Sequence, residues 1–240
     1  RDTNEEKAIS AEDQEFMILE SRFLSNPGIA IEQSKTAAKK MAEQSKTALN
    51  LSFGLLDHFQ EETAFRVEKI EAKVDRYEDE LGTYLIKLNQ KDLSLEDSHS
   101  LSIMLHCIGD FERISDHALS IMKSAREISG KNASFSPKAV QELHVMEKAV
   151  SDIVEKAYNV FANQDMKMAE EIEPLDEVID ELSRELKRRH VNRLRAGECT
   201  IEMGFVLSDI TTSLERIADH CSNIGVCVTQ VREDLYDTHS

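Results

Sequence analysis

The feature of this sequence that most limits its fold is a six-residue pattern that occurs once in each half of the chain. The pattern is Glu-Arg-Ile-x-Asp-His, and it occupies residues 112–117 and 215–220. A looser match precedes it in each half, at residues 68–75 and 173–180, in the same order and at nearly the same spacing. Because two ordered matches do not arise readily by chance, the sequence predicts an internal duplication, with one structural unit built twice.

Each unit is predicted to contain three long helices, because apolar residues follow the helical period and few residues interrupt them. The chain has only 8 Gly and 3 Pro, which disfavour helix interiors. Pro174 is expected to kink or restart the fifth helix, and Asn26-Pro27-Gly28 is a stop signal after the lead-in residues. Ser136-Pro137 is a helix start. The predicted helices are 29–59, 62–88, 95–128, 137–161, 165–194 and 200–231.

These patterns predict an all-α fold of two tandem, sequence-related three-helix bundles. The predicted boundaries are a lead-in segment at 1–27, a first repeat at 28–130 and a second repeat at 131–235. The stretch at 130–134 is rich in turn-forming residues, which favours a division there.

The charge of the chain excludes some partners. Its net charge is −17, which argues against nucleic acid and against a basic face on an anionic membrane. No apolar run is long enough to span a bilayer, so no direct membrane insertion of this segment is expected. The four cysteines form no CxxC pair, which fits a reducing cytoplasm, and Cys107 and Cys221 are predicted to be core residues.

Four pairs of acidic residues carry the candidate chemistry. In every pair an acid is followed four residues later by Asp, so the two carboxylates lie on one face of a helix and repel by about 0.2–0.5 kcal/mol. The helical phase places the pairs at seams between helices or at their rims, where an acid needs a partner. The pairs are Glu71/Asp75, Glu112/Asp116, Asp176/Asp180 and Glu215/Asp219.

Three partners for these acids are open on the residues alone. A bound cation is one, since oxygen ligands suit Mg²⁺, Ca²⁺, Mn²⁺ and iron. Salt bridges are another, with Arg113 and Arg216 pairing between helices. A bundle oxidoreductase is the third, but no Glu-x-x-His motif occurs in the four pairs. No hydrolase or nucleotide-binding motif appears either, so the chain is predicted not to be an enzyme. His117 and His220 are expected to be polar surface residues or to form hydrogen bonds between helices, rather than to ligate metal.

One basic cluster late in the fifth helix has two interpretations. Cations at the C-terminal end of a helix complement its dipole, and they also suit contact with a partner or with phosphate. The cluster is Lys187, Arg188, Arg189, Arg193 and Arg195.

At the two Glu-Arg-Ile-x-Asp-His motifs, and over about residues 28–232, the chain resembles the PhoU family. The resemblance implies two similar three-helix bundles whose motif carboxylates ligate multinuclear iron or zinc clusters. Carried over to this chain, the implied metal ligands are Glu71, Asp75, Glu112, Asp116, Asp176, Asp180, Glu215 and Asp219.

Residues 22–30, 190–205 and 214–224 resemble a subfamily, the cytoplasmic C-terminal domain of bacterial sodium/phosphate cotransporter family proteins. This resemblance implies a regulatory domain of phosphate uptake, tethered to the inner face of the plasma membrane. The implied partner is then the membrane domain of a phosphate transporter in the same polypeptide. Formation of a homo-oligomer is compatible with this arrangement. The start at Arg1 rather than Met agrees with an excised domain. The first repeat departs from this pattern at one position, where it has Ser120 and the second repeat has Asn223. The alternatives are a metal-free helical adaptor and a free-standing PhoU-type regulator of a phosphate ABC transporter and its sensor kinase.

Overall fold

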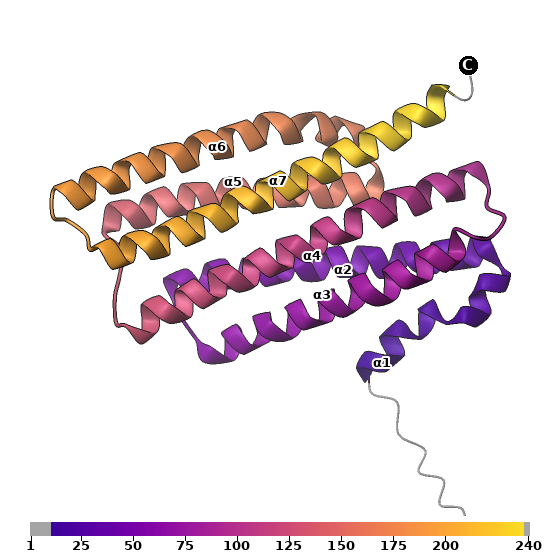
Figure 1. Cartoon of the computed structure of the whole chain (residues 1–240), viewed down its shortest axis with the longest axis horizontal. Helices are drawn as coiled ribbons and strands as arrows, with labels where there is room; N and C mark the ends of the chain where they lie inside the picture. Colours follow the sequence, from indigo (N-terminus) through magenta and orange to yellow (C-terminus); the bar gives the residue numbers. More distant parts are fainter. Residues whose placement is uncertain (1–10, 238–240) are drawn as a thin grey trace, which may run out of the picture.

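The computed structural model describes residues 11–237, with side chains from 13 to 234, and this part of the chain is helical without any strand. A short lead-in segment comes first, with α1 (Ala11–Phe16) and the 3-10 turns η1 (Met17–Leu19) and η2 (Ser21–Ser25). The long helices are α2 (Pro27–Asp57), α3 (Glu61–Leu88), α4 (Leu95–Gly130), α5 (Pro137–Asn163), α6 (Met166–Arg195) and α7 (Ile201–Asp237) (Figure 1). The predicted all-α fold with six long helices is confirmed.

Short polar side chains start the helices. Ser136 accepts a hydrogen bond from Ala139 N at 3.3 Å, which confirms the predicted start of α5. Asn26 accepts one from Ile29 N at 3.4 Å, so Asn26-Pro27 starts α2 directly as well as ending the lead-in. Of the two expected effects of Pro174, a kink or a restart of the fifth helix, the restart is wrong, because α6 continues through this residue. Proline removes one backbone donor, and the buried residues Ile172 and Ile179 on either side hold the helix in place.

The helices form two groups of three that share one core. The first group is α2, α3 and α4, the second is α5, α6 and α7, and α4 packs along α7 in the middle of the molecule (Figure 1). Buried apolar residues run continuously through both groups. The rings of Phe111 on α4 and Phe161 on α5 pack with their centroids 5.0 Å apart. Cys107 and Cys221 are fully buried, as expected for core residues.

Close packing of α2 against α4 sets how α4 is turned. Buried Ala and Ser residues line α2, and small side chains let two helices approach closely. Ser45 Oγ donates to the carbonyl oxygen of Phe111, and Ser52 Oγ donates to that of Ala118, both at 2.8 Å. These two bonds flank the first Glu-Arg-Ile-x-Asp-His motif, so α2 holds one side of α4 and leaves the motif acids toward α3.

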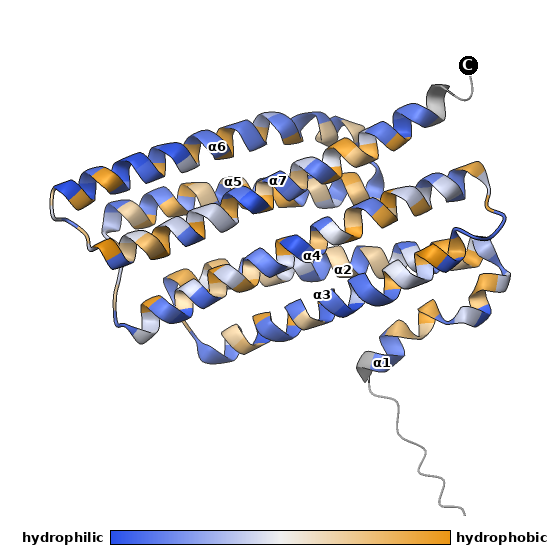
Figure 2. Ribbon diagram, in the orientation of Figure 1, coloured by the Kyte–Doolittle hydropathy of each residue, from blue (hydrophilic) through white to orange (hydrophobic). Residues whose placement is uncertain are grey.

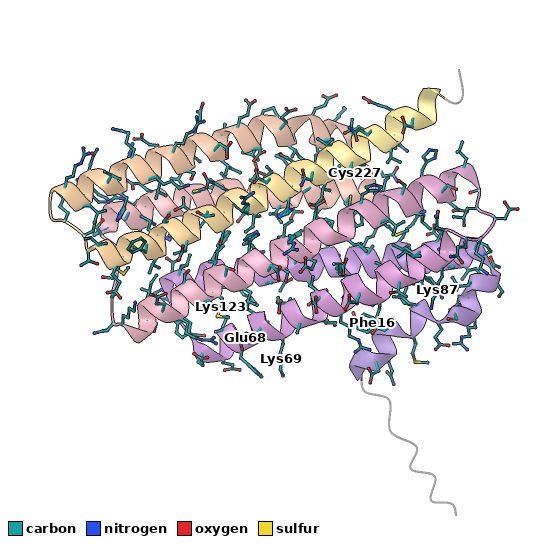
Figure 3. The ribbon with its side chains drawn as sticks, viewed as in Figure 1. Phe16, Glu68, Lys69, Lys87, Lys123 and Cys227 are labelled. Carbon is teal, nitrogen blue, oxygen red and sulfur yellow. The ribbon has the colours of Figure 1, made fainter. Side chains whose placement is uncertain are left out.

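The lead-in segment packs on α3. Phe16 is 6% exposed, and its ring lies 4.6 Å from that of Tyr77 and 4.2 Å from the guanidinium of Arg76 (Figure 3). Glu15 accepts a hydrogen bond from the Tyr77 hydroxyl and pairs with Lys73. The residues that precede the bundle are therefore fastened to the helix that carries Glu71 and Asp75.

Polar residues cover the outer helices. Figure 2 shows that α6 is mainly hydrophilic along its length, with hydrophobic residues in the stripe that faces the core. None of the helices between residues 11 and 237 combines the length and the apolar character that a bilayer crossing requires.

Candidate functional site

The carboxylates predicted in the first repeat gather where α3 packs against α4. Glu71 and Asp75 come from α3, and Glu112 and Asp116 come from α4. The charge of the Asp116 carboxyl raises the pKa of both Glu71 and Glu112. Glu78, one turn beyond Asp75 on α3, acts on Glu112 as well. We call these five residues the first acidic cluster.

Burial and mutual repulsion make this cluster hold its protons tightly. The pKa of Glu112 is raised to about 7, chiefly by burial and then by the charge of Asp116. Burial and the charges of Asp116 and Asp75 also raise the pKa of Glu71. Carboxyls in this state share protons at neutral pH, and a cation among them removes the repulsion. The first cluster therefore has the electrostatic character of a cation site.

Arg113 partly neutralises the first cluster from the solvent side. Its guanidinium lies 3.5 Å from Glu112 Oε2 and 3.3 Å from Asp116 Oδ2, and its side chain is 61% exposed. Arg216 stands likewise 3.6 Å from Asp219. The expectation that these arginines pair between helices is wrong, because each folds back onto an acid of its own helix. Exposed pairs of this kind contribute little to stability.

The second repeat assembles its acids at the seam of α6 and α7. Asp176 accepts a hydrogen bond from Ser222 Oγ at 2.7 Å, and its other carboxylate oxygen is buried without a partner. Burial raises the pKa of Asp176, and the charges of Asp219, Asp180 and the neighbouring Glu173 raise it further. We call the following five residues the second acidic cluster: Glu173, Asp176, Asp180, Glu215 and Asp219.

The two clusters differ because a lysine of the neighbouring helix pairs with one of the acids in the second cluster. Lys187 Nζ pairs with Glu215 Oε2 at 2.8 Å. At the position of the first repeat that corresponds to Lys187 the chain has Gly82, and Glu78 corresponds to the buried Ser183. The second cluster therefore lacks the acid that Glu78 supplies and gains an internal ion pair. Sequence reasoning missed Glu78, and it assigned Lys187 to the basic cluster of the fifth helix rather than to Glu215, although each lies one or two turns from a predicted acid on the same helix face.

The acids do not converge on a single point. Among the side chains from 13 to 234, no group of three or more Asp, Glu, His or Cys residues is arranged to hold one metal ion. Asp75, Asp180 and Asp219 lie exposed at the rims, while Glu71 and Asp176 are half-buried. The donor set is carboxylate oxygen from two helices, which suits hard cations. Ligation by any of these sets requires the exposed Asp side chains to turn inward.

The motif histidines meet each other between the two repeats. The rings of His117 and His220 stack with centroids 5.9 Å apart. His220 Nδ1 lies 2.8 Å from Asp110 Oδ1, which also accepts a hydrogen bond from Asn223 Nδ2 at 3.3 Å. Burial, and then the charge of His220, lowers the pKa of His117. The expected hydrogen bond between helices is present for His220, whereas His117 contacts the facing helix through its stacked ring. Asp110 was missed, although it lies two turns before His117 on α4.

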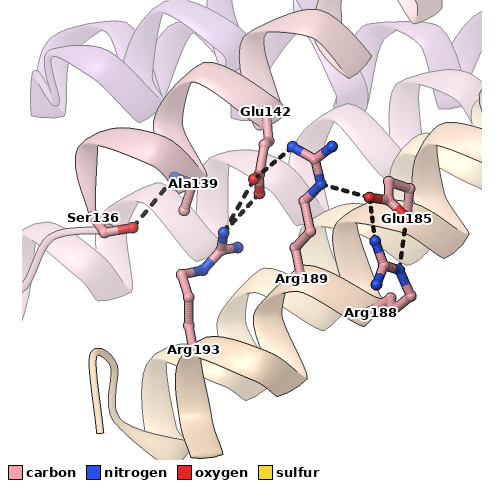
Figure 4. A network of polar contacts seen from close by, with 7 residues as sticks. All are labelled: Ser136, Ala139, Glu142, Glu185, Arg188, Arg189 and Arg193. Carbon is pink, nitrogen blue, oxygen red and sulfur yellow. Dashed lines mark hydrogen bonds and ion pairs between the residues drawn. The ribbon is translucent and has the colours of Figure 1, made fainter. Parts of the chain in front are cut away.

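The basic cluster of α6 is largely neutralised by carboxylates. Arg188 and Arg189 both donate to Glu185, and Arg193 donates to both oxygens of Glu142 at 3.1 and 2.9 Å (Figure 4). Arg193 is 7% exposed. This cluster therefore fastens α6 to α5, and it does not present an open patch of positive charge.

Comparison with known proteins gives the family and the fold. The PhoU domain family matches residues 38–125 and again residues 143–228. The "Phosphate-specific transport system accessory protein PhoU homolog 1" of Thermotoga maritima is 26% identical over 192 residues, which covers 79% of this chain and 82% of that protein. The "Phosphate-specific transport system accessory protein PhoU homolog" of Zymomonas mobilis is 26% identical over 190 residues, covering 79% of each.

Two solved structures have the same fold. The crystal structure of PhoU from Pseudomonas aeruginosa superposes with a TM-score of 0.78 at 20% identity, covering 85% of this chain and 97% of that one. The phosphate transport system regulatory protein PhoU from Streptococcus pneumoniae gives a TM-score of 0.76 at 17% identity, covering 86% and 97%. With its two family matches and this shared fold, the chain belongs to the PhoU family.

Proposed function

We propose that this chain regulates phosphate uptake as a metal-binding PhoU-type protein and does not catalyse a reaction. Membership of the PhoU family supports the regulatory role, since relatives are described as accessory proteins of a phosphate-specific transport system. The proposal places the chain in the cytoplasm with a phosphate transporter as its partner.

The observation that carries the metal proposal is the first acidic cluster. The charge of Asp116 opposes the ionisation of two other carboxyls, and the pKa of Glu112 is raised to about 7 by burial and by that neighbour. Ionising these clustered carboxyls costs free energy when no counter-ion is present. A bound metal ion removes this cost, and the candidates are iron, zinc, Mg²⁺, Mn²⁺ and Ca²⁺. The proposed ligands are the eight carboxylates of the four predicted pairs.

Metal binding would act by joining neighbouring helices. A cation in the first cluster ties α3 to α4, and one in the second ties α6 to α7. Because α4 and α7 pack together in the middle, both events change the same central pair of helices. The lead-in segment is fastened to α3 through Phe16 and Tyr77, so a preceding membrane domain would be coupled to the first cluster.

The comparisons favour a free-standing regulator over a cotransporter domain. The named relatives are described as accessory proteins of a phosphate-specific transport system. The cotransporter link rests on the resemblance at residues 22–30, 190–205 and 214–224. Binding assays with detergent-solubilised phosphate ABC transporter and with a sodium/phosphate cotransporter membrane domain separate the two: the partner that captures this chain decides between them.

Elemental analysis tests the metal proposal. The protein is purified without affinity metals, and its metal content is measured by mass spectrometry before and after chelation. We expect metal in the native protein and its loss in the Asp116→Ala/Asp219→Ala variant, with Asp209→Ala, an exposed acid of α7, as the matched control. Unchanged metal content in the folded double variant would overturn the ligand assignment.

A metal-free helical adaptor is the second candidate, and the ion pair between Lys187 and Glu215 favours it. That pair supplies a cation to the second cluster from within the chain. In this case chelation leaves both the melting temperature and transporter binding unchanged, whereas the metal-binding proposal requires both to fall.

A further inference from the structure

One end of the bundle contains a cavity of about 380 Å³, where α7 approaches its end and α2 and α4 begin (Figure 1). Its wall also includes the C-terminal end of α5, so both repeats contribute. Lys35 and Lys39 of α2 and Arg232 of α7 line it, and Ile103 and Met104 of α4 form an apolar part of the wall. We call it the basic cavity.

The basic cavity carries excess positive charge in a strongly acidic protein. Its wall contains one carboxylate, Glu32, which accepts a hydrogen bond from Lys35 Nζ at 2.8 Å. Across the side chains from 13 to 234, neither Lys39 nor Arg232 has an ion-pair partner, and Nε of Arg232 is buried without an acceptor. With three basic side chains and one carboxylate, the wall holds a net charge of +2, in a chain whose net charge is −17.

The end of α5 offsets only part of this charge. Asn163 and Gln164 stand at its C-terminus in the wall, and the carbonyl end of a helix carries about half a negative charge. The Ser100 hydroxyl and the Gln164 amide add neutral donors to the same space. Several donors and more than one uncompensated positive charge match a doubly charged oxyanion better than a single carboxylate.

We propose that the basic cavity binds a small phosphate-bearing anion, either inorganic phosphate or a phosphate monoester, between Lys39 of the first repeat and Arg232 of the second. The volume lies at the small end of ligand sites, which suits a small molecule. Binding there joins α2 to α7 across the two repeats. The cavity is separate from the acidic clusters, so the proposal stands or falls independently of metal binding.

The test is isothermal titration calorimetry of the full chain, at low ionic strength and with a chelator present. The probes are inorganic phosphate, AMP as a phosphate monoester, and acetate as a monocarboxylate control. We expect saturable binding of phosphate or AMP at one site per chain, at least tenfold tighter than acetate. Binding of phosphate alone assigns free phosphate, and binding of AMP alone assigns a monoester.

Variants locate the binding. Lys39→Gln and Arg232→Gln are each expected to weaken binding at least tenfold, while Lys148→Gln, the same charge change at an exposed position of α5, leaves it unchanged. Arg232→Lys, which keeps the charge, recovers part of the affinity, and thermal melting verifies that each variant is folded. No saturable binding of either phosphate probe, or native affinity in both folded Gln variants, would overturn the proposal.

Discussion

Replacing Glu112 with Gln is expected to stabilise the metal-free protein, whereas the same change at the corresponding Glu215 is expected to destabilise it. The first substitution removes a charge that burial and Asp116 oppose, and the new amide donates to the Asp116 carboxylate. The second removes an acid that pairs with Lys187 at 2.8 Å and leaves the lysine unpaired. Glu215→Gln is therefore a matched control of opposite sign.

The pKa of Glu112 sets the magnitude. It is about 7 instead of 4.5, and each tenfold change in proton affinity corresponds to about 1.4 kcal/mol. The free energy of unfolding can therefore rise by at most about 3 kcal/mol at pH 8 when Glu112 is replaced. The side chain is 19% exposed and has Arg113 beside it, and solvent screening reduces the gain to about 1–2 kcal/mol. For a chain of this length, the melting temperature rises by about 3–6 °C. The loss at Glu215 is about 0.2–1 kcal/mol.

The pH dependence follows from the sign of the pKa shift. Because the folded pKa of Glu112 is raised, the folded state binds more protons than the unfolded state between pH 4.5 and about 7. The cost of the native carboxyl therefore appears as the pH rises through this window and is complete above it. The gain of Glu112→Gln should be full at pH 8 and absent at pH 4.5.

Thermal melting in a chelating buffer, followed by circular dichroism at both pH values, measures the effect. Adding metal should reverse the order at pH 8, because the variant loses a ligand that stabilises the native protein. A Glu112→Gln variant that melts at or below the native temperature at pH 8 in chelator would refute the electrostatic account of the first acidic cluster.

Three further predictions concern other parts of the bundle. Burial raises the pKa of Glu147 to about 7, so Glu147→Gln should stabilise by about 2 kcal/mol at pH 8 and have no effect at pH 4.5 in thermal melting. Gly204→Ala should change the melting temperature little, because the end of the His190 side chain must turn aside for the new Cβ, which offsets the roughly 1 kcal/mol that Ala gains over Gly inside a helix. A hydrogen bond with Cys107 lowers the pKa of Cys227 to about 7, so iodoacetamide should label Cys227 before Cys107 in peptide mapping.

The sequence alone determines the features that depend on one helix at a time. The periodicity and the scarcity of Gly and Pro lead to six long helices, and Ser136-Pro137 marks a start that the structure confirms. The spacing of Glu112 and Asp116 places both on one face of α4 whatever packs beside it. The repeated motif likewise predicts two equivalent units before any contact is known.

The tertiary structure decides which side chains from different helices meet. Helical spacing gives the angle between residues of one helix, but not how that helix is turned against its neighbours. The bonds from Ser45 and Ser52 of α2 hold α4 in one rotation, and only then does Asp116 reach Glu71. In the same way, Lys187 of α6 reaches Glu215 of α7. The electrostatic surroundings of each motif come from the facing helix, so two motifs with nearly the same sequence have different surroundings.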